Sequence, residues 1–592
     1  MKTKFKEKNM QDTYRCEHCN DVNKKQVGKT IQVAGWVSTI RDHGGITFID
    51  LRDETGIVQV VVENDALIKG VTKEAVISVT GKVTSRGEGN VNPKLATGEV
   101  EVVVDKLDLL GPVTRPLPFE VGESKGVRED VRLKYRYLDL RDPELHNHII
   151  FRSKVISFIR KEMEDLGFLE ITTPILTVSS PEGARDFLVP ARQHPGKFYA
   201  LPQSPQMFKQ LLMIGGFDRY FQIAPCFRDE DARADRAAGE FYQLDMEMAF
   251  STQEDWFEIG EKIYTDIFKK FSKKKMSKAP FRRIPYNESM EMYGTDKPDL
   301  RNPLIIKDVT KVFANTNFNA FKGSTVKAIA VHDIAGKPRS FYDTLTDKMV
   351  EVGSKGLAWI KVEAKGEFNS PIAKFLSDEE KKGLTQILGA KEGTSIFLIA
   401  NKARIATKLS GMLRNFLGDE LKLCDPNKVE FCWIVDFPLY ELTDDGKLDF
   451  AHNPFSQPKG GMDAFKLDPL EIHADQWDLV CNGYEVASGA VRNHDCRVME
   501  KMFALVGYGP EVVREKFGAM YEAFQYGAPP HSGMAPGIER TLMLLLDEEN
   551  IKEVIPFPLN KSAFDPLTGA PGEVSNKQLE EVHIKVDIKK GK

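Results

Sequence analysis

The sequence has 592 residues, of which 41% are apolar and 29% are charged, and its net charge at pH 7 is −5. One hydrophobic core does not grow to this length, so we expect several domains. The charge shows no basic excess of the kind typical of nucleic-acid binding, although a local basic surface would suffice for it.

The N-terminus and the cysteines predict a protein of the reducing cytoplasm. The first residues, MKTKFKEKNM, carry lysines with no apolar run after them, unlike a secretory signal. No apolar stretch approaches the ~20 residues that a membrane span needs, and seven cysteines in so long a chain do not suggest a disulfide framework. Cys16, His18 and Cys19 lie close together, but a zinc site would need a second pair of ligands, and no CxxC or HxxxH follows nearby.

The region from about residue 30 to 105 predicts a small β-barrel. Its short strand patterns, separated by Gly-rich breaks, are TIQVAGWV, GITFIDLRD, GIVQVVVE, AVISVTGKV and GEVEVVV. A closed barrel of this size includes the oligonucleotide-binding (OB) fold as one form. Arg41, Asp42 and His43 occupy the first break, and Phe48 follows in a strand. Cationic and aromatic side chains on a barrel face are what stacking on single-stranded bases requires, although a purely structural barrel remains the alternative.

The rest of the chain alternates linker, helical and extended patterns. Pro, Gly and charged residues from 111 to about 129 predict a hinge. A helical segment follows, with Gly167 placed to end it, and its apolar stripe is Phe151, Val155, Phe158, Ile159, Met163 and Leu166. FLEITTPIL reads as a strand whose Pro174 belongs at an edge, a bulge or an interface. From about residue 302 to 422, strand and helix patterns alternate as in an inserted α+β domain, and strands then resume with VEFCWIVDFPLYEL.

Several motifs, in the right order, resemble those of class II aminoacyl-tRNA synthetases. FLEITTPIL resembles motif 1, FRDEDARADRAAGEFYQLD motif 2 and GMAPGIERTLMLLL motif 3. PEGARDFLVP, ALPQSPQMFKQLLM, NGYEVASGAVR and YGTDKPDLR are similar to segments of the bacterial-type aspartyl-tRNA synthetases, and the resemblance runs from about residue 14 to the end.

The resemblance implies an α+β fold, in which an antiparallel sheet flanked by helices is accompanied by an N-terminal OB-fold barrel and interrupted by an α+β insertion. The expected divisions are an anticodon-binding barrel over 1–112, a hinge over 113–135, catalytic parts over 136–301 and 423–560, the insertion over 302–422, and a C-terminal extension over 561–592. Motif 1, around Pro174, resembles a dimer interface, so we expect a homodimer.

The family's reaction joins L-aspartate to ATP, giving aspartyl-adenylate and pyrophosphate, and then moves aspartate to the 3′-terminal adenosine of tRNA(Asp). The attacking carboxylate is already ionised at neutral pH, so the protein has to position the groups and stabilise charge rather than supply a base.

The resemblance assigns the ATP and magnesium residues. Arg228, Arg540 and Glu485 match catalytic positions: Arg228 at the α-phosphate, where its planar fork suits phosphate, and Arg540 on the adenine face opposite Phe241. Asp478 and Glu485 match an acidic pair that holds Mg²⁺. The remaining matched ATP positions are Asp229, Glu230, Gly537, Ile538 and Glu539.

The amino-acid site implied by the resemblance is selective through charge. Lys209 and Arg492 match two cations set against the side-chain carboxylate of aspartate, which should disfavour asparagine and repel lysine. His452 matches a histidine that closes over the substrate. The other matched aspartate-binding positions are Glu182, Ser204, Gln206, Arg228 and Asp245.

The tRNA contacts implied by the resemblance lie in the barrel and the motif 2 loop. Phe48 and Gln59 match residues that read anticodon bases, with Arg41 and His43 beside them, and Asp235 of the loop reaches towards the acceptor end. The segment Asp42-His43-Gly44-Gly45, with Gly89, is similar to that of relaxed members that also charge tRNA(Asn) and depend on a partner amidotransferase.

Two departures from the family pattern and two rival functions accompany this interpretation. Ala237 cannot make the side-chain contact to ATP that a glutamine makes there, and Asn453 replaces a second histidine. One rival is an asparaginyl or lysyl enzyme of the same subclass, against which Lys209 and Arg492 argue. The other is a catalytically dead relative that binds tRNA, against which the presence of Arg228 and Arg540 argues.

Overall fold

The computed structural model describes residues 13–179, 183–443 and 445–588, and the chain divides into two compact units, Met1–Glu120 and Val121–Lys592. Among the described residues, no helix is both long enough and apolar enough to span a membrane.

The first unit is a closed five-stranded barrel, as the strand patterns predict. Strands β3 and β5 pair in parallel, and the other neighbours pair antiparallel. The apolar residues of the alternating pattern, such as Val33, Ile49 and Val60, fill the interior. In spatial order the strands are β1 (Thr30–Asp42), β2 (Thr47–Arg52), β3 (Ile57–Val62), β5 (Val100–Gly111) and β4 (Val76–Ser85).

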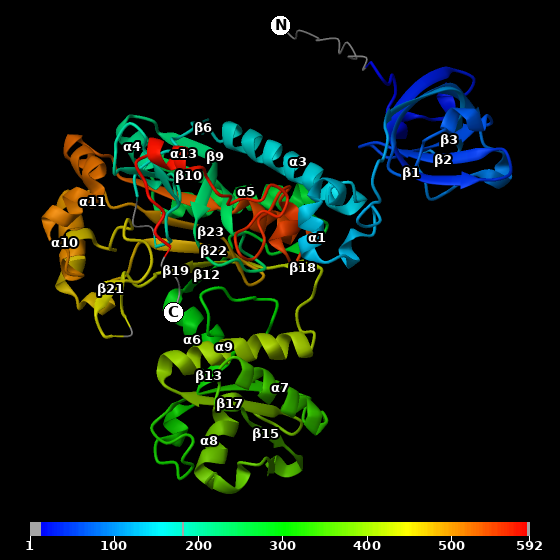
Figure 1. Ribbon diagram of the computed structural model, residues 1–592. Helices are drawn as coiled ribbons and strands as arrows, with labels where there is room; N and C mark the ends of the chain where they lie inside the picture. The colour runs from blue at the N-terminus through cyan, green and yellow to red at the C-terminus, as the bar shows by residue number, and fades with distance from the viewer. Residues whose placement is uncertain (1–12, 180–182, 444, 589–592) are drawn as a thin grey trace. The chain divides into compact units, whose positions relative to one another are not determined.

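The second unit is built on an eight-stranded sheet that is antiparallel except at its two edge pairs (Figure 1). Helices α3 (Pro143–Asp165), α5 (Gln253–Phe271) and α12 (Ile538–Leu546) pack on one face of this sheet in a single apolar core. In spatial order the strands are β12 (Arg282–Pro285), β19 (Phe431–Val435), β22 (Gln476–Cys481), β23 (Tyr484–Val491), β24 (His531–Pro536), β10 (Gly239–Ala249), β9 (Arg219–Arg228) and β6 (Leu169–Glu170).

Strand β10 explains how the sheet separates core from site. Successive side chains of a strand point to opposite faces. Leu244, Met246 and Met248 belong to the core that α3 and α5 cover. Asp245 and Glu247 alternate with them and are buried on the other face. The alternation of apolar and acidic residues in this segment is therefore the signature of a strand with a core face and a polar, functional face.

The α+β insertion has its own five-stranded sheet between two apolar clusters. Helices α7 (Arg339–Glu351) and α9 (Ala403–Glu420) cover one face, and α8 (Asp378–Leu388) covers the other. In spatial order the strands are β13 (Ile306–Asp308), β14 (Thr325–Val331), β17 (Ser395–Asn401), β15 (Ala358–Val362) and β16 (Phe368–Asn369). Helix α9 also packs on α6 (Tyr286–Tyr293), where Gly294 and Gly411 let the two backbones touch.

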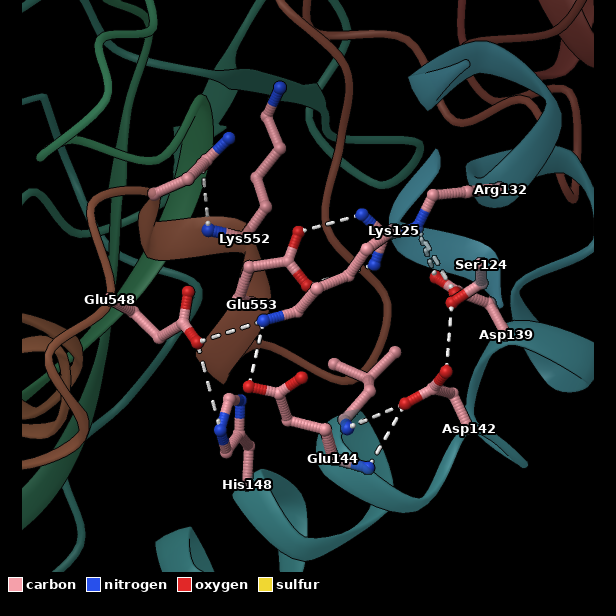
Figure 2. Close-up of polar contacts among 12 residues, drawn as sticks. Ser124, Lys125, Arg132, Asp139, Asp142, Glu144, His148, Glu548, Lys552 and Glu553 are labelled. Atoms are coloured by element: carbon pink, nitrogen blue, oxygen red, sulfur yellow. Dashed lines mark hydrogen bonds and ion pairs between the residues drawn. The ribbon is translucent and has the colours of Figure 1, made fainter. Parts of the chain in front are cut away.

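The expected hinge is partly helical. Residues 129–134 form α1 (Glu129–Lys134), followed by α2 (Arg136–Asp139). Figure 2 shows the polar contacts that hold this segment: Arg132 reaches both Asp139 and Glu553, at 3.1 and 2.8 Å. Arg136 is buried and donates to the carbonyls of residues 552, 555 and 556. The charged residues that led to the prediction of a linker thus attach this helical segment to residues 552–556.

Helix α3 ends as predicted, with Leu166 as its C-cap and Gly167 in the left-handed region at φ 79°. The strand expected from FLEITTPIL is shorter than predicted, because β6 holds only Leu169 and Glu170. Beyond it, Ile171 N–H donates to the Phe221 carbonyl, and Pro174, three residues later, has no N–H to continue the ladder.

The second unit contains further short strands and helices. They are β7 (Leu188–Pro190), β8 (Phe198–Ala200), α4 (Gln206–Ile214), β11 (Lys275–Met276), β18 (Lys428–Val429), β20 (Tyr440–Leu442), β21 (Leu448–Phe450), α10 (Cys496–Leu505), α11 (Pro510–Ala523) and α13 (Asn576–Glu581).

Candidate functional site

Two connected hollows open on the sheet face opposite the apolar core. One has a volume of about 640 Å³ and the other about 1020 Å³. Both are lined by Arg228, Gln243, Glu485 and Ala535. A ligand in one hollow would therefore meet a ligand in the other beside Arg228, which brings a positive charge to the junction.

The smaller hollow contains the predicted aromatic and arginine residues of a nucleotide site. The Arg228 guanidinium lies 5.0 Å from the Phe241 ring centroid. Arg540, on the first turn of α12, donates to the Glu485 carbonyl at 2.9 Å, the Asp235 carbonyl at 3.1 Å and the Asp235 carboxylate at 3.2 Å. Because Asp235 belongs to the loop between β9 and β10, these bonds tie motif 3 to the motif 2 loop.

The other predicted ATP residues divide into those that line this hollow and those that do not. Glu230, Gly537 and Glu539 line it. The carboxylate of Glu539, however, already accepts from Arg152 at 2.7 Å and from the Tyr242 N–H at 3.0 Å. Glu539 therefore links helix α3, through Arg152, to the backbone of strand β10.

Two of the predicted ATP residues do not line either hollow. Asp229 lies beside Arg185, with 3.8 Å between the guanidinium and the carboxylate. Ile538 is buried in the core beneath the sheet.

The larger hollow has a buried chain of opposite charges on its floor. Lys209 Nζ donates to Asp245 Oδ1 at 2.6 Å and lies 3.4 Å from Glu247 Oε2. Arg492 donates to both oxygens of Glu247, from Nε at 3.0 Å and from Nη2 at 3.3 Å. The order of charges is therefore Asp245, Lys209, Glu247, Arg492, and all four side chains are buried.

The environment of each acid sets its pKa in a different direction. Burial raises the pKa of Asp245 more than Lys209 lowers it. Burial also acts on Glu247, but Arg492 and Lys209 together outweigh it and hold the pKa of Glu247 below its usual range. Gly533 makes room for this carboxylate, because a Cβ there would lie 1.8 Å from Glu247 Oε2. Glu247 thus keeps its charge between two cations.

The other described residues that were predicted to bind aspartate line the same hollow. Ser204, Gln206 and His452 line it, together with Lys209, Asp245 and Arg492. His452 packs edge-on against Tyr286 and Phe437, and burial lowers its pKa. Glu182 lies outside the described residues.

Sequence reasoning missed three buried polar residues beneath this hollow. Glu247 shares the face of β10 with Asp245, and the two-residue period of the strand could have found it. Gln206 donates to Gln210, and Gln210 lies 2.9 Å from His531 Nε2. The distance between positions 210 and 531 in the chain hides that contact from the sequence.

Asp478 and Glu485, the predicted magnesium ligands, lie on neighbouring strands. Burial, and then the charge of Glu485, raise the pKa of Asp478 well above its usual range. Asp478 Oδ1 is buried without a hydrogen-bond partner among the described residues, whereas Glu485 is half-buried and borders both hollows. An orphaned carboxylate oxygen beside a second acid fits a divalent cation, for which oxygen ligands are preferred.

The predicted anticodon residues share one face of the barrel. Arg41 grips Asp50 with two hydrogen bonds of 2.6 and 2.8 Å, and its Nη2 lies 3.4 Å from Gln59 Oε1. Phe48 lies directly opposite Arg41 in the β1–β2 register and packs edge-on against His43. A cation, an amide and an aromatic ring therefore lie together, in the combination that base stacking and base reading need.

The cysteine and histidine cluster near the N-terminus is engaged in the barrel. Cys19 is buried, which raises the pKa of its thiol far above the ordinary value. The Cys16 thiol donates a hydrogen bond to the Gln32 carbonyl, and His18 Nδ1 lies 3.2 Å from the Asp53 carboxylate. Within the described ranges, the group of three side chains close enough to share a metal ion lies elsewhere, at Glu144, His148 and Glu548.

That group already contains a cation. Figure 2 shows the contacts of Lys125 with Glu144 and Glu548. The Lys125 Nζ lies 2.7 Å from Glu144 and 3.9 Å from Glu548. Its ammonium supplies the positive charge that a metal ion would otherwise bring.

Comparison with known proteins gives consistent matches over almost the whole chain. Residues 128–561 match the family described as tRNA synthetases class II (D, K and N), and residues 31–110 match the OB-fold nucleic acid binding domain. The aspartate–tRNA ligase of Streptomyces coelicolor is 51% identical over 580 residues, which are 97% of this chain and 98% of that protein. The aspartate–tRNA(Asp/Asn) ligase of Rickettsia bellii is 50% identical over 587 residues, with 96% and 97% covered.

Solved structures agree on the fold. The asparaginyl-tRNA synthetase of Pyrococcus horikoshii, in complex with asparaginyl-adenylate, superimposes with a TM-score of 0.55 at 19% identity, over 92% of this chain and 97% of that one. The aspartyl-tRNA synthetase of Entamoeba histolytica gives a TM-score of 0.54 at 19% identity, with 90% and 89% covered.

Proposed function

Because this chain belongs to the class II tRNA synthetases and, among them, to the aspartate–tRNA ligase family, we propose how its two hollows divide the work of that reaction. The enzyme uses ATP to join L-aspartate to tRNA. The single observation that carries the proposal is that the hollow with the buried charge chain on its floor and the hollow that holds Phe241 and Arg540 share Arg228 in their lining.

The larger hollow binds aspartate through Lys209 and Arg492. Both cations keep their buried acid partners, so they are held in place before the substrate arrives. Arg492 Nη1 makes no hydrogen bond to the described residues and is left for an incoming carboxylate. Asparagine carries no charge to meet these cations, and a cationic side chain would be repelled by them.

The smaller hollow binds ATP, with the adenine between Phe241 and Arg540 and the α-phosphate at Arg228. Arg540 is fixed by three hydrogen bonds before the nucleotide binds. The substrate carboxylate, ionised at neutral pH, then attacks the α-phosphorus, and pyrophosphate leaves. Arg228 stabilises the negative charge that develops there, and positioning does the rest.

Asp478 and Glu485 would hold Mg²⁺ at the same junction. When bound, the ion neutralises phosphate charge. The protein's own contribution is the pair of carboxylates, one buried and orphaned, the other facing both hollows.

The motif 2 loop would receive the acceptor end of tRNA in the second step. Asp235 is held by Arg540, and the neighbouring Ala234 carbonyl accepts from the Ile551 N–H at 2.8 Å. These bonds order a loop whose Ala237 and Ala238 offer no polar side chain.

For tRNA choice we propose relaxed specificity, with tRNA(Asn) charged as well as tRNA(Asp). The segment from Asp42 to Gly45 favours it, while relatives that are 51% and 50% identical are named aspartate–tRNA ligase and aspartate–tRNA(Asp/Asn) ligase, respectively. A tRNA-dependent amidotransferase would then convert the aspartyl group on tRNA(Asn). Aspartylation of a pure tRNA(Asn) transcript tests this, and no product beside an active tRNA(Asp) control would refute it.

We also propose a homodimer through the motif 1 segment. Leu169, Leu176 and Val178 are 54%, 54% and 60% exposed, a run of apolar side chains without cover in the isolated chain. Light scattering on the full chain should give twice the monomer mass.

The decisive test is ATP–pyrophosphate exchange with aspartate, asparagine, lysine and glutamate compared side by side. We expect exchange with aspartate alone. Exchange with asparagine or lysine would refute the roles of Lys209 and Arg492. No exchange at all, in protein that still binds tRNA, would indicate a catalytically dead relative and direct attention to Ala237 and Ala238.

A further inference from the structure

The loop between α6 and the insertion brings a cation to the two acids assigned to magnesium. Lys297 Nζ lies 3.2 Å from Glu485 Oε2 and 3.2 Å from Asp296 Oδ2. The charge of Asp478 also acts on Lys297. One ammonium therefore lies in contact with two carboxylates, and one of them, Glu485, belongs to the acid pair assigned to magnesium.

This loop is fixed by the insertion. Arg414 of α9 is fully buried and donates to the carbonyls of Asp299, Asn302 and Leu304 at 3.0, 2.6 and 2.7 Å. The Asn302 amide returns a hydrogen bond of 2.9 Å to the Arg414 carbonyl. A buried arginine that donates hydrogen bonds to three carbonyls of this loop restricts the movement of the loop. The position of Lys297 is therefore fixed by the fold.

The immediate surroundings of Lys297 reinforce that position. Its N–H donates to Thr295 Oγ1 at 3.1 Å, and Asp299, two residues on, is gripped by the guanidinium of Arg301 at 2.7 Å. The Lys297 side chain is 38% exposed. The ammonium is therefore held at the acids and is still accessible to ions from solvent.

We propose that Lys297 is a resident counter-ion of the Asp478–Glu485 pair, which holds Glu485 in place in the metal-free enzyme and competes with free divalent cations for it. The inference rests on the magnesium site proposed above. A free ion must displace the ammonium, whereas an ion that arrives with ATP brings phosphate oxygens as further ligands and negative charge to offset the repulsion. Lys297 is thus a positioning residue that makes metal loading depend on the nucleotide.

Binding of Mn²⁺ without nucleotide, followed by electron paramagnetic resonance on the full chain, tests the proposal. Lys297→Met should bind Mn²⁺ about tenfold more tightly than the wild type, because a like charge a few ångströms from the ion is removed. Lys297→Arg should behave as the wild type. Lys348→Met is the matched control, since Lys348 is 36% exposed and pairs with Glu420 at 2.5 Å in the insertion.

The double variant Lys297→Met/Asp478→Asn separates the two possible failures. If the gain is lost in the double variant, the acid pair is the site and Lys297 its competitor. If the gain persists, the metal lies elsewhere and the proposed magnesium site is wrong. If Lys297→Met binds Mn²⁺ no better than the wild type, or more weakly, the counter-ion role is refuted.

Discussion

Replacing Lys209 by methionine is the sharpest perturbation of the buried charge chain. Lys209 is 1% exposed and is the cation that bonds Asp245, at 2.6 Å. Methionine fills a similar volume without the charge. Arg492 bonds Glu247 and not Asp245, so the variant leaves the Asp245 carboxylate buried without a cation.

The expected cost is large because the buried Asp245 carboxyl, once it has lost its cation, must either stay charged without a partner or take up a proton. Removing one partner of a buried ion pair typically costs on the order of 3–5 kcal/mol. Arg492→Met should cost less, because Lys209 still lies 3.4 Å from Glu247. The double variant Lys209→Met/Asp245→Asn removes the orphaned charge as well, so it should recover most of the lost stability.

Activity should not recover with stability. The substrate's side-chain carboxylate still lacks its cation in the double variant, so exchange with aspartate should remain impaired. Thermal unfolding, followed by the fluorescence of the buried core residues Trp256, Trp433 and Trp477, measures the first effect, and ATP–pyrophosphate exchange measures the second. A double variant no more stable than Lys209→Met would refute the account of the orphaned acid. A double variant that regains exchange would refute the substrate role of Lys209.

Three further predictions test other parts of the site. Gly533→Ala places a Cβ 1.8 Å from Glu247 Oε2 and 2.5 Å from the Met246 carbonyl oxygen of β10. Both the carboxylate and the paired strand must shift, so the KM for aspartate should rise about tenfold or more in the exchange assay, more than the KM for ATP does. Phe241→Ala should do the reverse, raising the KM for ATP by roughly tenfold through the lost aromatic surface. Because the pKa of Glu247 is lower folded than unfolded, its contribution to stability is present above about pH 4.3 and is lost as the pH falls. The difference in melting temperature between wild type and Glu247→Gln should therefore shrink below that pH, and a constant difference would contradict the ion pairing.

Local sequence patterns were sufficient to predict the elements whose formation depends mainly on neighbouring residues. The barrel strands and α3 with its terminal Gly167 follow from periodicity and turn residues. The hinge did not, because Arg132 and Arg136 bond not only the nearby Asp139 but also partners more than 400 positions later in the chain. Composition predicts exposure for such a segment, and only the folded structure supplies the acids and carbonyls that order it.

The residues of the candidate site could be predicted where a motif identifies them individually. They were harder to predict where the role depends on the direction in which the side chain points. Phe241 and Asp245 point into the hollows, as the resemblance implies. Ile538 and Glu539 adjoin Arg540 in the same motif, yet one is core and the other is bonded to Arg152 and the β10 backbone. Neighbours in a helix face different directions, so adjacency in a motif does not imply a shared role.

The buried charge chain itself argues for function rather than stability. Apolar residues of similar volume often replace a buried ion network at no cost or with a gain in stability. The core face of β10, with Leu244, Met246 and Met248, shows that this strand readily carries such residues. On the opposite face, Asp245 and Glu247 hold two cations at the floor of a hollow and leave one guanidinium nitrogen for a ligand. An arrangement that an apolar pair could replace is accounted for by the aspartate site proposed above, in which the acids hold Lys209 and Arg492 in place for an incoming carboxylate.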